Sequence, residues 1–148
     1  MENNQDKGFT LIELLVVITI LGILAVIGLG SFSSSQMKGR DAQRKNDLSQ
    51  IQKALEMYYN DNGSYPLTNQ MQTLLNTGGS WTAAGGSTIY MKTVPKGPKG
   101  DVYCYESDGS YYRLYAKLEN VRDPKIITPQ SSICASYNYG VSSSNITP

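Results

Sequence analysis

A single carboxylate, Glu13, lies near the start of an otherwise apolar run. Residues 14–29 read LLVVITILGILAVIGL, and no ionisable side chain occurs between Glu13 and Lys38. A carboxylate costs on the order of 2.5 to 3.5 kcal/mol at the centre of a membrane-spanning helix and less near the interface. Because such a charge is tolerated mainly when it is paired, Glu13 is a candidate functional acid that needs a cationic partner.

Histidine is absent from all 148 residues. Its absence excludes His-based general-base catalysis, Ser-His-Asp triads and His-ligated metal sites. The remaining Ser, Tyr, Lys and carboxylate side chains form no recognisable catalytic arrangement, so we expect that the chain is not an enzyme and uses no cofactor. We expect no metal site, because the candidate acids lack the spacing of a calcium-binding loop. A bound calcium ion is the alternative. These acids are Asp101, Glu106, Asp108, Glu119 and Asp123.

The length of the apolar run indicates a membrane-spanning helix. Residues 9–30 comprise 22 residues, about 33 Å of helix, which matches a hydrocarbon core of about 30 Å. A signal peptide or signal anchor is the alternative interpretation. However, the start carries Glu2 and Asp6 against the single Lys7, and the run is longer than a signal peptide needs. We therefore predict a transmembrane segment over residues 9–30.

An amphipathic helix is predicted to follow over residues 31–62. Apolar side chains recur there at spacings of three and four: Leu48, Ile51, Leu55 and Tyr58. The charges between them are interpreted as a solvated face, with Asp41 and Lys45 placed for an i,i+4 ion pair. The helix is expected to end near residues 60–63, because Asn-Asp-Asn-Gly is a stop signal and Pro66 opposes continuation.

Residues 63–148 predict a small globular head with an antiparallel sheet, which makes the chain α+β. A short helix is expected over residues 67–76, followed by a Gly/Ser/Thr loop around Trp81. Alternating Tyr, Leu and Val predict a hairpin of strands 101–106 and 110–118, joined by a turn at 107–109. A third strand is predicted over residues 133–139.

The two cysteines, Cys104 and Cys134, are 30 positions apart, and no C-x-x-C motif is present. A four-ligand zinc site would lack its ligands. An even pair in a chain with a membrane or export signal instead suggests one disulfide. It would join the first predicted strand to the third and contribute about 2 to 4 kcal/mol to a head that is small for stability by core burial alone.

The run Lys7-Gly8-Phe9-Thr10-Leu11-Ile12-Glu13-Leu14 resembles the processing site of type IV prepilins and type II secretion pseudopilins. The resemblance covers residues 7–59 and weakens after Pro66. It implies a type IV pilin-like fold, a leader peptide over residues 1–8, and cleavage between Gly8 and Phe9 by a prepilin peptidase that then N-methylates Phe9. Glycine allows close approach of the backbone to such a protease.

The family also implies a role for Glu13 in assembly, in which its carboxylate neutralises the new amine of Phe9. The i,i+4 spacing permits this pairing within one chain, and the family pairs it with a neighbouring subunit. Gly22 and Gly30 either allow close helix packing or let the helix bend on assembly, and the residues leave both alternatives open. The implied partners are the prepilin peptidase, other pilin or pseudopilin subunits, an inner-membrane assembly platform and the lipid bilayer.

The implied topology places the leader in the cytoplasm and the head outside the inner membrane, in a periplasmic or cell-surface filament. Basic residues after the apolar run oppose this topology under the positive-inside rule: Lys38, Arg40, Arg44 and Lys45. We follow the family, because the processing motif is the more specific signal and a cysteine pair suits an oxidising compartment.

The loop over residues 95–103 is similar to a degenerate form of the Pro- and Gly-containing loop of the major pseudopilin of type II secretion. A structural subunit of a pilus-like or pseudopilus filament is therefore the expected function. A membrane-anchored binding module, such as a minor pilin for adhesion or DNA uptake, is the alternative. Lys92, Lys96 and Lys99 form a short basic stretch, which we interpret as a solvated loop rather than a DNA site.

Overall fold

The computed structural model describes residues 8–148, with the side chains of residues 30 and 31 left out. The leader predicted over residues 1–8, including Lys7, therefore lies outside the described residues except for Gly8. The chain divides into two compact units, Met1–Gln36 and Met37–Pro148, and each is considered by itself.

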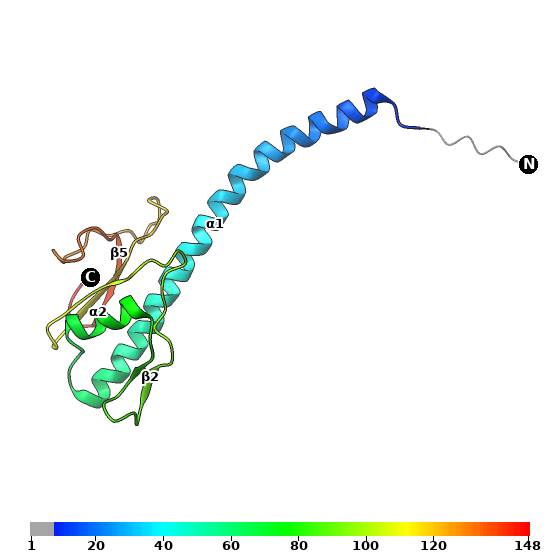
Figure 1. The fold of residues 1–148 in the computed structure, drawn as a ribbon. Coiled ribbons are helices and arrows are strands. Elements are labelled where there is room, and N and C mark those ends of the chain that lie inside the picture. The colour runs from blue at the N-terminus through cyan, green and yellow to red at the C-terminus, as the bar shows by residue number, and fades with distance from the viewer. Residues whose placement is uncertain (1–7) are drawn as a thin grey trace, which may run out of the picture. The chain divides into compact units, whose positions relative to one another are not determined.

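The helix α1 (Leu11–Asn62) is the longest element of the chain (Figure 1). It begins two residues after the predicted start at Phe9 and ends within the predicted range. Gly63 terminates it with a φ of 69°, and its amide donates to the carbonyl of Tyr59 at 2.8 Å. Glycine adopts this left-handed conformation without the steric cost that a Cβ would impose.

The second unit contains the remaining elements (Figure 1). The helix α2 (Thr68–Thr77) confirms the short helix predicted over residues 67–76. One antiparallel sheet pairs β1 (Trp81–Thr82) with β2 (Ile89–Met91). The other has the order β3-β4-β5, with β3 (Cys104–Ser107), β4 (Tyr112–Ala116) and β5 (Tyr139–Ser142). The predicted α+β class and the 101–118 hairpin are confirmed.

Two predictions about the head were wrong. Trp81 begins a short strand and is buried, whereas a loop was predicted around it. The third strand is β5, so the segment predicted over residues 133–139 is mostly a loop of turns. The strand begins at Tyr139, and its second residue, Gly140, lies against the ring of Tyr115, where an added Cβ would be 2.5 Å from the ring. Only glycine fits at this close approach.

The core of the head lies between α1, α2 and the three-stranded sheet. The apolar stripe predicted on α1 is confirmed, because Leu48, Ile51 and Leu55 are completely buried. Tyrosine rings fill much of the remaining core, and several of their hydroxyl groups find partners at its edge, although the buried hydroxyl of Tyr115 has no hydrogen-bond partner among the described residues. For example, the hydroxyl of Tyr105 donates to the carbonyl of Pro66 at 2.9 Å. Such partners allow a polar hydroxyl to be buried without an unpaired donor.

Side chains of α2 cover the outer edge of β3. Gln72 donates to the carbonyl of Tyr103 at 3.0 Å and accepts from the amide of Tyr105 at 2.9 Å. One turn earlier, the hydroxyl of Thr68 makes the same pair of bonds to the backbone of Ser107. These two side chains supply the hydrogen bonds that a further strand would make, and so they block this edge.

Candidate functional site

The start of α1 is closed by a reciprocal contact between Thr10 and Glu13. The backbone amide and the hydroxyl of Thr10 each donate to Oε2 of Glu13 at 2.8 Å, and the amide of Glu13 donates to the hydroxyl of Thr10 at 3.3 Å. This arrangement is a capping box, which satisfies amides that have no partner in the first turn of a helix. The T-x-x-E spacing signals it in the sequence, and the sequence interpretation missed it.

The two residues predicted for cleavage come directly before the capping box, and both are exposed. Phe9 is 87% exposed, and Gly8 has no other group near the position of an added Cβ. Oε1 of Glu13 receives no hydrogen bond from any described residue. One oxygen of the Glu13 carboxylate thus caps its own helix, and the other is available to an external cation.

The first unit exposes its large apolar side chains. Between Leu11 and Leu29 every Leu, Ile and Val is exposed, from 47% for Val16 to 89% for Leu11. This part of α1 is long and apolar enough to cross a membrane by length and composition. Apolar surface of this extent needs lipid or other apolar helices as its surroundings.

In the second unit, α1 carries a buried ion network that the sequence interpretation placed in solvent. Asp41, Arg44 and Asp47 are between 2% and 5% exposed. Arg44 donates to Asp41 at 2.8 Å, to Asp101 at 2.5 Å and to Glu119 at 2.9 Å. The interpretation of these charges as a solvated face was therefore wrong, because loops distant in sequence cover them.

The predicted i,i+4 pair between Asp41 and Lys45 was also wrong. Asp41 pairs with Arg44 one turn along the helix, and it accepts the amides of Glu119 at 2.9 Å and Asn120 at 2.8 Å. Lys45 pairs with Asp123 at 2.6 Å. Besides the pair of Asp41 with Arg44, the charges of α1 thus hold the segment that follows β4.

The contacts with these cations lower the pKa of two acids, Glu119 and Asp123. Glu119 accepts a bidentate pair of hydrogen bonds from Arg40 and further hydrogen bonds from Arg44 and Lys99. Together these donors lower the pKa of Glu119 well below the usual range. The hydrogen bond from Lys45 likewise lowers the pKa of Asp123. In both cases a hydrogen bond from a cation stabilises the ionised carboxylate.

Asp47 shows the opposite shift. Burial raises its pKa, while the hydrogen bond from the hydroxyl of Tyr103, at 2.6 Å, acts in the other direction. Desolvation disfavours the charged carboxylate here, and no cation of residues 8–148 is paired with it to offset this effect.

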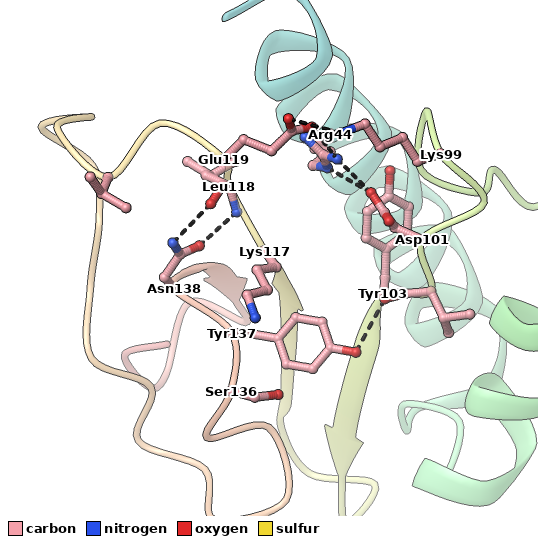
Figure 2. A pocket seen from close by; sticks show the side chains of 12 residues that line it. Arg44, Lys99, Asp101, Tyr103, Lys117, Leu118, Glu119, Ser136, Tyr137 and Asn138 are labelled. Carbon is pink, nitrogen blue, oxygen red and sulfur yellow. Dashed lines mark hydrogen bonds and ion pairs between the residues drawn. The ribbon is translucent and has the colours of Figure 1, made fainter. Parts of the chain in front are cut away.

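A cavity of about 620 Å³ opens beside this network (Figure 2). Tyr137 and Asn138 line it on one side, and both are fixed by backbone contacts. Asn138 exchanges two hydrogen bonds with the backbone of Leu118, at 2.7 and 3.1 Å, and the hydroxyl of Tyr137 donates to the carbonyl of Val102 at 3.2 Å. Lys117 also lines the cavity and is paired with no carboxylate of residues 8–148.

Four of the five acids considered for calcium accept hydrogen bonds from groups of the chain itself, and the fifth, Glu106, lies 3.7 Å from Arg113. Asp101 and Glu119 contact Arg44, and Asp123 contacts Lys45. Asp108 closes its own turn by accepting from Ser110. Within the described residues no group of three or more His, Cys, Asp or Glu side chains is placed to hold a metal ion.

The disulfide between Cys104 and Cys134 is present, with Cα atoms 5.8 Å apart. Cys134 lies in the loop before β5 rather than on a strand, which corrects the predicted location. Its amide donates to the hydroxyl of Ser131 at 3.2 Å. The bridge therefore ties the later part of the loop over residues 119–138 to the first residue of β3, while the ion network holds the beginning of that loop.

The predicted basic stretch is divided by the fold. Lys99 pairs with Glu119 at 3.1 Å, while Lys92 and Lys96 form no ion pair with a described carboxylate. The three lysines thus differ in their ion pairing.

Comparison with known families identifies two matching regions. Residues 3–29 match the prokaryotic N-terminal methylation motif, and residues 32–117 match the model of type II secretion system protein G. No solved structure gives a significant match.

Curated relatives agree with the second match. The type II secretion system core protein G of Pseudomonas aeruginosa is 36% identical over 113 residues, covering 74% of this chain and 80% of that protein. The core protein G of Vibrio cholerae is 36% identical over 110 residues, covering 71% and 73%. That of Escherichia coli is 32% identical over 111 residues, covering 73% and 77%. With the family model spanning more than half of its residues, the chain belongs to the type II secretion system protein G family, the major pseudopilins.

Proposed function

We propose that this chain is the main structural subunit of a type II secretion pseudopilus, made as a prepilin and polymerised through α1. The observation that carries this proposal is the N-terminal segment, where a methylation motif leads into a helix with exposed apolar side chains and one acid at its start. A structural subunit needs no catalytic group, and the ion network and cavity of the head contain no recognisable catalytic arrangement.

Processing is proposed at the bond between Gly8 and Phe9. Residues 1–8 form the leader, and a prepilin peptidase removes it and methylates the amine of Phe9. The exposure of Phe9 and the open surroundings of Gly8 support this site, because a protease needs both residues accessible. Residues 9–30 then anchor the chain in the inner membrane, with the head outside the cytoplasm, until the assembly platform adds the subunit to the filament.

Glu13 is proposed to bind the amine of Phe9 on a neighbouring subunit during assembly. Oε2 is engaged by Thr10, and Oε1 is available for this contact. An unpaired carboxylate and an unpaired amine are each costly in apolar surroundings, so their pairing favours the assembled state. The acid would thus have two separable tasks, one in capping its own helix and one in attracting the next subunit.

The intact mass and N-terminal sequence of the protein from native membranes test the processing step. We expect a chain that starts at a methylated Phe9. A chain that still starts at Met1, or that is cut beyond residue 31, would contradict the proposal.

Two substitutions of Glu13 separate its tasks. Glu13→Gln keeps an oxygen that accepts from Thr10 but has no charge, whereas Glu13→Ala removes both. If the charge drives assembly, both variants are processed normally and neither forms filaments. Filaments from Glu13→Gln in wild-type amounts would show that capping alone matters. Thr10→Val, which removes the capping hydroxyl and retains the acid, is the matched control.

A further inference from the structure

Positive charge collects at one end of the unit of residues 37–148. The ion network joins residues 38–45 of α1 to the segments 99–101 and 117–125, and Figure 2 shows their meeting point beside the cavity. These three segments contain eight cations and four carboxylates, a net charge of +4. We call them the cationic end.

Negative charge collects at the other end of this unit. Residues 56–65, which close α1, meet residues 106–113, which include the turn between β3 and β4. The hydroxyl groups of Tyr65 and Tyr112 donate to Glu56 at 3.0 and 3.1 Å and so hold the two segments together. These segments contain four carboxylates and one cation, a net charge of −3. We call them the acidic end.

The two ends are too far apart to neutralise each other within one copy of the chain. Asp41 and Glu56 are 15 positions apart on α1, which corresponds to about 22 Å of helix. The strands β3 and β4 run between the same two ends, because the turn that joins them lies in the acidic end. Exposed charges are largely screened beyond a Debye length of about 8 to 10 Å. Each end therefore presents its charge to its surroundings.

Both ends have exposed charged side chains without a partner of opposite charge. Asp61 and Asp108, at the acidic end, are exposed and form no ion pair with a cation of residues 8–148. Four cations at the cationic end are likewise exposed, and none pairs with a described carboxylate: Lys38, Lys117, Arg122 and Lys125. These side chains are free to bind charges of another molecule.

Asp61 is unfavourable for the helix that contains it. It lies in the last turn of α1, where the negative end of the helix dipole disfavours a carboxylate. That turn has no basic residue that would offset the effect. A cation supplied by another molecule would remove this cost, so Asp61 is suited to an intermolecular contact.

Exposed apolar side chains accompany the charges at both ends. Met57 and Tyr59 are 50% and 41% exposed at the acidic end, and Val121 is 78% exposed at the cationic end. Protein interfaces commonly combine a central apolar contact with a polar rim. The two ends thus have complementary charge and also apolar surface that a contact would remove from water.

We propose that the acidic end of one copy binds the cationic end of the next copy in the filament. The inference rests on the proposed function, since it requires a polymer of this chain. A contact between two different surfaces of identical subunits is heterologous, and such a contact can repeat along an open filament. Contacts between like ends would bring charges of the same sign together, so a two-fold arrangement of these ends is disfavoured.

The contact is expected to be weak between free copies and effective within a filament. One exposed ion pair changes an association constant by at most about five-fold. In the proposed filament α1 already holds the copies together, so their ends meet at a high effective concentration and several weak pairs act jointly. The two ends would then align the heads rather than drive polymerisation by themselves.

Carbodiimide cross-linking of filaments tests the proposal. The filaments are sheared from host cells that overproduce the full chain. The reagent joins a carboxylate to a lysine only where the two groups are in contact, and mass spectrometry of the covalent dimer identifies the joined residues. We expect Asp61 and Asp108 to be joined to lysines of the cationic end in the dimer but not in the monomer, with a yield that falls at high salt.

The chain supplies its own control lysines. The expected partners at the cationic end are Lys38, Lys117 and Lys125. The controls are exposed, lie outside both ends and pair with no carboxylate of residues 8–148: Lys53, Lys92 and Lys96. A contact between the two ends predicts few links from Asp61 or Asp108 to these controls.

A pair of variants provides a second measurement. Arg122→Glu reverses one charge of the cationic end and is expected to reduce the joining of Asp61 to that end by at least about five-fold. Lys53→Glu makes the same change of charge outside both ends and is expected to leave the joining unchanged. Thermal unfolding of both variants checks that they are folded. Equal losses in the two folded variants would overturn the assignment to the cationic end.

The remaining outcomes distinguish this inference from the function on which it rests. Filaments that form without these links, or that join the acids equally to the control lysines, overturn the contact and leave the proposed function intact. Links from Asp61 and Asp108 only to a different protein overturn the assignment to a second copy. A chain that forms no filaments overturns both the proposed function and the contact.

Discussion

Replacing Arg44 with methionine tests whether the ion network attaches the loops of the head to α1. Removing one partner of a buried ion pair costs about 3 to 5 kcal/mol, because the other charge remains buried. Asp101 and Glu119 are 40% and 25% exposed and can turn toward water, whereas the side chain of Asp41 is 3% exposed. Since Asp41 keeps two backbone amide donors, we expect a loss near 3 kcal/mol.

The assay is thermal unfolding of the full chain in detergent micelles, followed by the near-ultraviolet circular dichroism of Trp81 and the tyrosines. For a unit of this size, 1 kcal/mol corresponds to about 4 °C, so Arg44→Met should lower Tm by about 12 °C. Arg113→Met is the matched control, because Arg113 is partly exposed and lies 3.7 Å from Glu106. The control should lose about 1 kcal/mol or less.

A double variant provides the second test. Asp41→Asn combined with Arg44→Met removes both charges, so its loss should be smaller than the sum of the two single losses by at least about 1 kcal/mol. Additive losses, or an Arg44→Met variant no less stable than Arg113→Met, would refute the reasoning that a buried charge pair holds these loops.

Three further predictions concern the same head. Because cationic donors lower the pKa of Glu119 in the folded state, its contribution to stability is complete above its ordinary value of about 4.3 and is lost as the pH falls toward the lowered value. Tm should therefore fall below about pH 4, and Glu119→Gln should show a smaller fall; an equal fall in both would contradict this account. Reduction of the Cys104–Cys134 bridge should destabilise the head by about 2 to 4 kcal/mol, seen as a lower Tm with reductant, while an unchanged Tm would remove the bridge from the stability argument. Gln72→Leu should cost about 1 to 3 kcal/mol in urea unfolding, because two backbone groups of β3 lose their partner, whereas the exposed Gln50→Leu should change little.

Features with a local cause were predictable from the sequence. The stop at Gly63, the short helix α2 and the β3-β4 hairpin each depend on neighbouring residues, and all three are present. The capping box of Thr10 and Glu13 was equally local and was overlooked, because the acid was considered for its charge and not for its position in the first turn.

The third strand was misplaced because its position is decided across the sheet. Residues 133–139 have strand-like composition, but pairing with β4 begins only at Tyr139. The disulfide and the turn at Cys134 hold the preceding residues in a loop. Composition along one segment contains no information about which of its residues face a partner strand.

The sequence by itself determined the processing motif, the apolar segment, the acid at its start and the long helix, because each depends on residue types at short spacings. Only the tertiary structure decided the environment of the charges on that helix. Arg44 is bound by Asp101 and Glu119, which are 57 and 75 positions away, and a charge pattern with helical spacing is the same whether such loops cover it or water does. The burial of Asp41 and Arg44 follows from that long-range packing.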